Sequence, residues 1–135
     1  MKQISLWDKF VAVSTYYTFG MTGIIWLIAS ILILKKQVTP FCLYHIYQSI
    51  FISVLLYVIT WIFNFMFPLM SSIPFIGELF RVIELYLFKI PIFYTFSLFN
   101  LILFMILSYL SLGAILGKLS YFPFISDVIR ANFRN

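Results

Sequence analysis

Cys42, His45 and Gln48 are the side chains best placed for chemistry, because they follow one another at intervals of three residues. On a helix this spacing places them on one face. A zinc site needs three or four donors, and the chain has no second histidine or cysteine. A Cys–His nucleophile needs a group that orients the imidazole and an oxyanion donor, and the sequence indicates neither. We therefore expect no catalytic residue, metal or cofactor here, and we expect His45 and Gln48 to form hydrogen bonds with neighbouring backbone or lipid headgroups.

The four acidic residues, Asp8, Glu78, Glu84 and Asp127, lie outside the strongly apolar stretches. Proton relays and cation-coupled transporters usually carry an acidic group inside a membrane span. With a single histidine and no such acid, the chain has too few titratable groups for acid–base catalysis. The sequence therefore predicts that the protein is not an enzyme.

The composition indicates lipid as the solvent of the folded chain. Of 135 residues, 64% are hydrophobic and only 10% are charged, whereas soluble domains carry about 25% charged residues. A disordered chain is excluded for the opposite reason, because it would be far less apolar. The net charge of +5 comes from basic residues at the ends of apolar stretches, where they meet lipid headgroups rather than nucleic acid.

Three long uncharged stretches predict a single transmembrane domain over residues 1–135. Each is long enough to cross a bilayer as a helix, and they run over 10–34, 41–67 and 90–117. Pro68 is expected to end the second stretch. The first is expected to be a retained span, since no small-residue cleavage site follows it. The basic pair Lys35-Lys36 and the C-terminus are placed on the cytoplasmic side.

Residues 73–89 behave differently from these three stretches. On a helix, Glu78, Arg81, Glu84 and Lys89 share one arc and apolar side chains cover the rest, which is typical of a helix lying in the membrane interface. The alternative is a fourth span, in which Glu78 pairs with Arg81 and Arg81 with Glu84. A shorter amphipathic tail over 123–135 follows, with Ser126 as its N-cap.

Each predicted span carries one mildly polar stripe. In the second and third spans its members are His45, Gln48, Ser49, Ser53, Tyr57, Thr60, Asn64, Ser97, Asn100, Ser108 and Ser111. Such stripes either pack helices together through hydrogen bonds or line a hydrated path or a groove for a client segment. Gly113 and Gly117 form a small-xxx-small motif on the opposite face of the third span, which predicts a second helix contact.

Two short motifs resemble a known family. One comprises Gly23-Ile-Ile-Trp26, Lys35-Lys36, Thr39-Pro40-Phe41 and His45-Ile-Tyr-Gln48-Ser49. The other is Gly117-Lys118 followed by Tyr121-Phe-Pro123-Phe-Ile-Ser-Asp127. With the hydropathy of residues 23–133, they resemble the small bacterial relatives of the twenty-kilodalton subunit of the chloroplast inner-envelope import translocon (the Tic complex). The resemblance implies an all-helical, multi-pass protein with a role in a protein-import channel.

These observations predict an all-α, multi-pass integral membrane bundle with three firm transmembrane helices and an interfacial or fourth helix. We expect it in the inner (cytoplasmic) membrane of a cell rather than in a plastid envelope, since no Ser/Arg-rich transit segment leads the chain. Its expected function is that of a translocation or assembly subunit that contacts client or partner membrane segments. The alternative is a self-associating small-solute channel or holin-like pore. Either requires the bilayer and a homo-oligomer or other membrane subunits.

Overall fold

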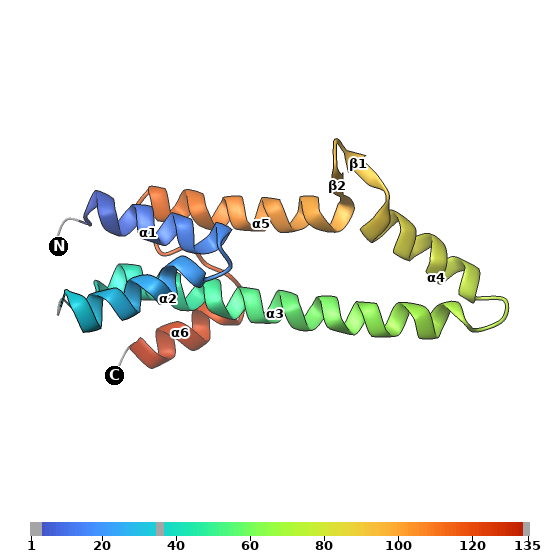
Figure 1. The fold of residues 1–135 in the computed structure, drawn as a ribbon, viewed down its shortest axis with the longest axis horizontal. Coiled ribbons are helices and arrows are strands. Elements are labelled where there is room, and N and C mark those ends of the chain that lie inside the picture. Colours follow the sequence, from blue (N-terminus) through green and yellow to red (C-terminus); the bar gives the residue numbers. More distant parts are fainter. Residues whose placement is uncertain (1–3, 35–36, 134–135) are drawn as a thin grey trace. The chain divides into compact units, whose positions relative to one another are not determined.

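The computed structural model describes residues 4–34 and 37–133, and these are mostly helical (Figure 1). Contacts divide the chain into two compact units. Unit 1 comprises the described residues up to 54 and from 107 onward, and unit 2 comprises residues 55–106. The loop residues Lys35-Lys36, which bear on the predicted orientation, lie outside the described part of the chain.

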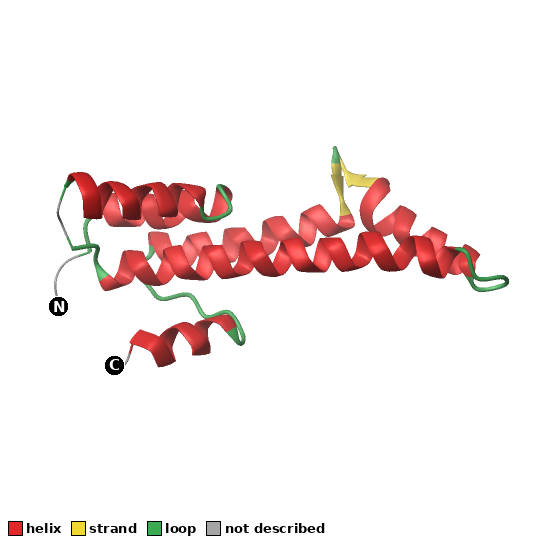
Figure 2. Cartoon of the chain, turned by 60° about the horizontal axis from the view of Figure 1, so that its bottom comes forward, coloured by secondary structure: helices red, strands yellow, loops and turns green. Residues whose placement is uncertain are grey.

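The elements follow one another in a simple order. They are α1 (Leu6–Tyr17), α2 (Met21–Ile28), the π-helical turn η1 (Ala29–Ile33), α3 (Pro40–Ser71), α4 (Gly77–Glu84), the π-helical turn η2 (Leu85–Lys89), β1 (Pro91–Phe93), β2 (Phe96–Ser97), α5 (Leu98–Ile115) and α6 (Ile125–Phe133). Figure 2 shows that helices dominate and that the two strands are short. The expected all-α class therefore holds apart from one small hairpin.

The first predicted span, 10–34, is not a continuous helix. The helix α1 ends at Tyr17, and Phe19 and Gly20 then adopt left-handed backbone angles, with φ of 53° and 86°. The Gly20 N–H donates to the Thr15 carbonyl at 2.7 Å, which closes the helix end. The chain reverses and α2 packs against α1. Glycine permits this turn because it lacks the Cβ that disfavours the left-handed region.

Two helices, rather than three firm ones, are therefore long and apolar enough to cross a membrane. They are α3, with 32 residues, and α5, with 18 residues, among the residues that the structure describes. The segment Met21–Ile33 is apolar but shorter. At about 1.5 Å per residue, neither half of the broken segment reaches the roughly 30 Å of a hydrocarbon core.

The helix α3 extends past its predicted end. Thr39 accepts a hydrogen bond from the Cys42 N–H at 3.3 Å and Pro40 occupies the first helical position, which are favourable choices for a helix start. Pro68 lies inside the last turn and does not end the helix. Pro68 has no N–H to donate to the Asn64 carbonyl, so the helix continues past it with one intrahelical hydrogen bond fewer, and the Ser71 hydroxyl donates to the Pro68 carbonyl at 3.0 Å.

The third predicted span, 90–117, begins eight residues later than expected, at Leu98. Pro91 favours extended backbone at Ile90, whose φ and ψ are −78° and 123°. The antiparallel hairpin of β1 and β2 then precedes α5. The Ser97 hydroxyl accepts the Asn100 N–H at 3.4 Å, which makes Ser97 the N-cap of α5.

Unit 2 is held by aromatic packing and local ion pairs. The Phe88 ring lies 5.0 Å from that of Phe99 and 5.9 Å from that of Phe67, between centroids, which is the usual range for aromatic pairs. Glu84 pairs with Lys89 at 2.8 Å rather than with Arg81, which was its predicted partner.

The remaining charged residues of this segment, Glu78 and Arg81, lie 3.8 Å apart as predicted, and both side chains are exposed. Exposed pairs of this kind contribute about 0–1 kcal/mol. The charges of residues 73–89 are thus neutralised by pairs within the segment. Such pairing suits both a helix in the membrane interface and a fourth span.

Candidate functional site

Unit 1 contains a buried group of polar side chains that we call the polar cluster: Tyr16, Tyr44, His45, Gln48, Ser120 and Ser126. They come from α1, from the first turns of α3, from the segment that follows α5, and from α6. Each is less than a tenth exposed. Buried polar atoms need hydrogen-bond partners, because an unpaired one costs about 1–3 kcal/mol. The cluster therefore has to hold these four parts of the chain together.

His45 lies between α1 and the segment after α5. Its Nε2 is 3.2 Å from the Lys118 carbonyl oxygen and its Nδ1 is 2.7 Å from the Tyr16 hydroxyl. A carbonyl oxygen only accepts, so Nε2 carries the hydrogen and Nδ1 of the neutral ring accepts from Tyr16. The Tyr16 hydroxyl also lies 2.6 Å from Gln48 Oε1. The single Tyr16 proton is therefore shared between Nδ1 and Oε1, and both contacts join α1 to α3.

Gln48 connects α3 to the C-terminal part of unit 1. Its Nε2 donates to the Ser120 carbonyl and to the Ser126 hydroxyl, each at 3.0 Å. The Tyr44 hydroxyl reaches the same two atoms at 2.8 and 2.9 Å. The Ser126 hydroxyl accepts the Phe122 N–H at 2.7 Å. Ser126 is therefore not the predicted N-cap of α6, which begins one residue earlier, because its hydroxyl serves the cluster and the preceding turn.

Close helix packing supports the cluster. Thr15 and Ser49 share a hydrogen bond of 2.9 Å between their hydroxyls. Gly23 of α2 lies against them, and a Cβ there would come within 2.8 Å of Ile46 Cγ2. A glycine at this position lets α2 approach α3 closely. Val11, Cys42 and Ile46 form the apolar core beside it.

The structure divides the predicted polar stripes between two environments. His45, Gln48 and Ser49 are buried in unit 1, and the Ser53 hydroxyl donates to the Ser49 carbonyl at 2.7 Å. Ser108 is half-buried, and Ser111 is buried with no hydrogen-bond partner for its hydroxyl in the described structure. In unit 2, Ser97 is buried, Thr60 is half-buried, and Tyr57, Asn64 and Asn100 are exposed. The polar side chains at the start of α3 are therefore buried and hydrogen-bonded within the protein, whereas Tyr57 and Asn64, further along the helix, are exposed.

Gly113 and Gly117 lie close to other residues of unit 1 in the described structure. Gly113 lies against Ser120, seven residues further along, and a Cβ at this glycine would overlap the Ser120 hydroxyl. Gly117 has a φ of 70° and follows the end of α5. The two glycines let the chain turn back, so that Ser120 can reach the cluster.

Tyr16, Tyr44, Ser120 and Ser126 are cluster members that the sequence did not reveal as a group. Tyr16, Ser120 and Ser126 bond to His45 or Gln48 over 29 to 78 residues, and Tyr44 bonds to Ser126 over 82 residues, and no local spacing encodes such pairs. The sequence pointed to these partners only indirectly, through His45 and Gln48. A glutamine and a histidine at the start of a strongly apolar helix require polar partners from elsewhere.

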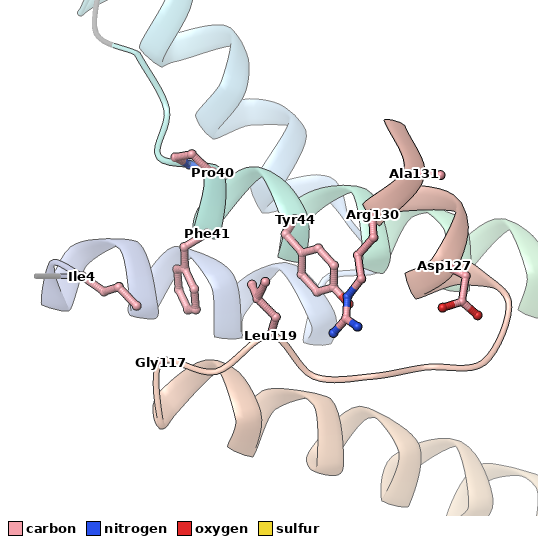
Figure 3. A pocket seen from close by; sticks show the side chains of 9 residues that line it. All are labelled: Ile4, Pro40, Phe41, Tyr44, Gly117, Leu119, Asp127, Arg130 and Ala131. Atoms are coloured by element: carbon pink, nitrogen blue, oxygen red, sulfur yellow. The ribbon is translucent and has the colours of Figure 1, made fainter. Parts of the chain in front are cut away.

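A pocket of about 730 Å³ adjoins the cluster at Tyr44 (Figure 3). Its lining residues are Ile4, Pro40, Phe41, Tyr44, Gly117, Leu119, Asp127, Arg130 and Ala131. The Arg130 guanidinium lies 5.7 Å from the centre of the Tyr121 ring, within the range of a cation–π contact. The Tyr121 hydroxyl donates to Asp127 at 2.9 Å, and this hydrogen bond raises the pKa of Tyr121.

The chemistry that this arrangement supports is binding and packing. Within residues 4–34 and 37–133, no three His, Cys, Asp or Glu side chains gather as metal ligands. Cys42 is buried in the apolar core, and the ring nitrogens of His45 bond to Tyr16 and Lys118. No known family model, curated protein or solved structure matches the chain.

Removal of the Tyr44 hydroxyl tests the cluster directly. Tyr44→Phe deletes the donor to the Ser120 carbonyl and the contact with Ser126. We expect it to lower the free energy of unfolding by about 1–2 kcal/mol, measured by denaturation in mixed detergent micelles. Tyr109→Phe is the control, because Tyr109 is 57% exposed. Equal effects of the two variants would contradict a structural role for the cluster.

Proposed function

We propose that this chain is a non-enzymatic membrane subunit that binds transmembrane segments of partner or client proteins, as a component of a translocation or membrane-protein assembly. The proposal is supported by α3 and α5, which are long and apolar enough to cross a bilayer. It belongs to the same class of function as that of the Tic-related proteins that the sequence resembles. Its proposed location is the inner membrane of a cell.

The observation that carries the proposal is the open end of the polar stripe on α3. Tyr57 is 73% exposed, Asn64 is exposed and Thr60 is half-buried. Spacings of three and four residues place the three side chains on one helix face. No side-chain hydrogen bond joins any of them to another described residue of unit 2. The polar atoms of His45 and Gln48, in contrast, are bonded inside the protein, and this difference supports a recognition role for Tyr57, Thr60 and Asn64.

The cost of a polar group in hydrocarbon explains why such a face would bind another helix. An amide or hydroxyl transferred to an apolar medium without a partner costs several kcal/mol. A polar side chain on a neighbouring transmembrane helix can satisfy it, and such interhelical hydrogen bonds contribute about 1 kcal/mol each. Tyr57, Thr60 and Asn64 thus favour association with a helix that carries its own hydroxyl or amide groups.

The double variant Thr60→Val, Asn64→Leu tests this recognition. Two lost interhelical hydrogen bonds of about 1 kcal/mol each correspond to roughly 10- to 30-fold weaker association. We expect a loss of that size in the proteins that copurify with the tagged chain from gently solubilised membranes, quantified by mass spectrometry. Ser53→Ala is the matched control, because the Ser53 hydroxyl already bonds to its own helix. An unchanged set of copurifying proteins would contradict the proposal.

The same variant distinguishes the alternative functions. Loss of self-association alone would show that a second copy of this chain occupies the stripe. Loss of solute flux across proteoliposomes would support the self-associating channel or holin-like pore and would overturn the translocation or assembly function.

A further inference from the structure

We propose that the pocket at Tyr44 is a binding site for one anionic phospholipid. This inference rests on the proposed membrane function, because it requires the chain to lie in a bilayer. The pocket is formed entirely within unit 1. Its position, its walls and its charge each point to this ligand.

The pocket lies where both candidate spans end. Pro40 is the first residue of α3 and Gly117 follows the last turn of α5, and both line the pocket. The ends of transmembrane helices lie at the level of the lipid headgroups. A lipid bound here would have its phosphate at the height of the neighbouring bilayer phosphates, with its acyl chains directed along the helices.

The walls suit an acyl chain. Ile4, Phe41, Leu119 and Ala131 supply apolar surface from the start of the chain, from α3, from the segment after α5 and from α6. Figure 3 shows Phe41, Tyr44 and Leu119 close together, with the Arg130 side chain extending toward them from α6. The volume of about 730 Å³ falls within the range of roughly 300–1,000 Å³ that is usual for small-molecule sites.

The cationic group that would bind an anion here is the Arg130 guanidinium. Arg130 lines the pocket and forms no ion pair with a described residue, and its guanidinium lies over the Tyr121 ring instead. The Lys9 ammonium lies near Gly117, which lines the pocket, since a Cβ at Gly117 would be 3.5 Å from Lys9 Nζ. The one lining carboxylate, that of Asp127, accepts the Tyr121 hydroxyl. Guanidinium and ammonium groups without carboxylate partners are typical donors to a lipid phosphate.

The first measurement is membrane retention, because it separates this inference from the proposed function. Extraction of the full chain from cell membranes by alkaline carbonate would overturn both. Retention allows the lipid test on protein purified in mild detergent. The protein is mixed with equal amounts of phosphatidylglycerol and phosphatidylcholine of identical acyl chains, and the bound lipids are counted by native mass spectrometry.

We expect phosphatidylglycerol to be retained about tenfold over phosphatidylcholine, because both lipids carry the phosphate but phosphatidylcholine adds a choline cation that offsets its charge beside Arg130. Arg130→Gln is expected to remove that preference. Arg81→Gln is the matched control, because Arg81 is exposed in unit 2 and pairs only with Glu78 among described residues. Leu119→Trp, which fills the pocket without changing its charge, is expected to reduce the binding of both lipids.

Three results would overturn the inference while leaving the proposed function intact. They are equal retention of the two lipids by the unmodified protein, an unchanged preference in Arg130→Gln, and binding of glycerol phosphate as strong as that of the whole lipid. The last would identify a site for a free phosphate group with no role for the apolar walls.

Discussion

Replacement of Gln48 by leucine is expected to lower the free energy of unfolding by about 3–5 kcal/mol. The carboxamide accepts from Tyr16 and donates to the Ser120 carbonyl and the Ser126 hydroxyl, and all of these groups are buried. Leucine has a similar size but removes three buried hydrogen bonds at about 1–1.5 kcal/mol each, while Tyr16, Ser120 and Ser126 each keep one other partner. The measurement is denaturant-induced loss of helicity in mixed micelles, followed by circular dichroism.

Phe51→Leu is the control for Gln48→Leu. Phe51 lies one turn further along α3 and is 47% exposed, so we expect a change below about 0.5 kcal/mol. A double-mutant cycle with Ser126→Ala should be non-additive, because the two side chains share a hydrogen bond. Strict additivity, or a stability equal to that of the unmodified chain, would show that the polar cluster does not hold α3 to the C-terminal segment.

Replacement of Gly113 by leucine is expected to destabilise unit 1 by about 2–4 kcal/mol. Even a Cβ at this position would overlap the Ser120 hydroxyl, and overpacking typically costs about 1–3 kcal/mol. Ser120 cannot move away without loss, because its hydroxyl donates to the Leu110 carbonyl at 3.1 Å and its own carbonyl accepts from Tyr44 and Gln48. The rest of the expected destabilisation comes from weakening these hydrogen bonds of Ser120.

Three additional variants separate a steric effect from a change in helix propensity. Gly113→Ala alone should already destabilise unit 1, although alanine is the better helix former. Ser120→Gly combined with Gly113→Ala should recover part of the stability, because it removes the overlapping side chain. Leu112→Ala, at a position that is 59% exposed, should have a small effect. Stabilisation by Gly113→Ala would contradict the close contact seen in the structure.

The polar cluster and the helix face that carries Tyr57, Thr60 and Asn64 show how one sequence pattern can meet two environments. His45 and Asn64 were predicted as members of one stripe, yet the first is fully buried and the second is exposed. Helical periodicity places residues on a face of a helix, but it does not say what covers that face. Whether a residue of the α3 stripe is buried depends on α1 and on the segment after α5, because these cover only the first turns of α3.

The sequence by itself determined the helical class and the two long apolar helices of this protein. Hydropathy is a property of contiguous residues, so the existence of α3 and α5 was readable, although α5 begins eight residues later than the predicted span. The same holds for the amphipathic segment around α4, whose charged residues pair locally. The predicted helix boundaries near Gly20, Pro68 and Pro91 differ from those of the structure. Composition alone specifies poorly where a helix begins or ends.

Only the tertiary structure decided the break of the first predicted span and the partners of His45 and Gln48. At Gly20 the reversal is favourable because Thr15 and Tyr16 then reach polar partners on α3. The cluster joins residues as far apart as Tyr44 and Ser126, which are separated by 82 positions. A buried polar group requires a partner but does not specify which one. The fold chose the partners, because hydrogen bonds over such distances depend on how the helices pack.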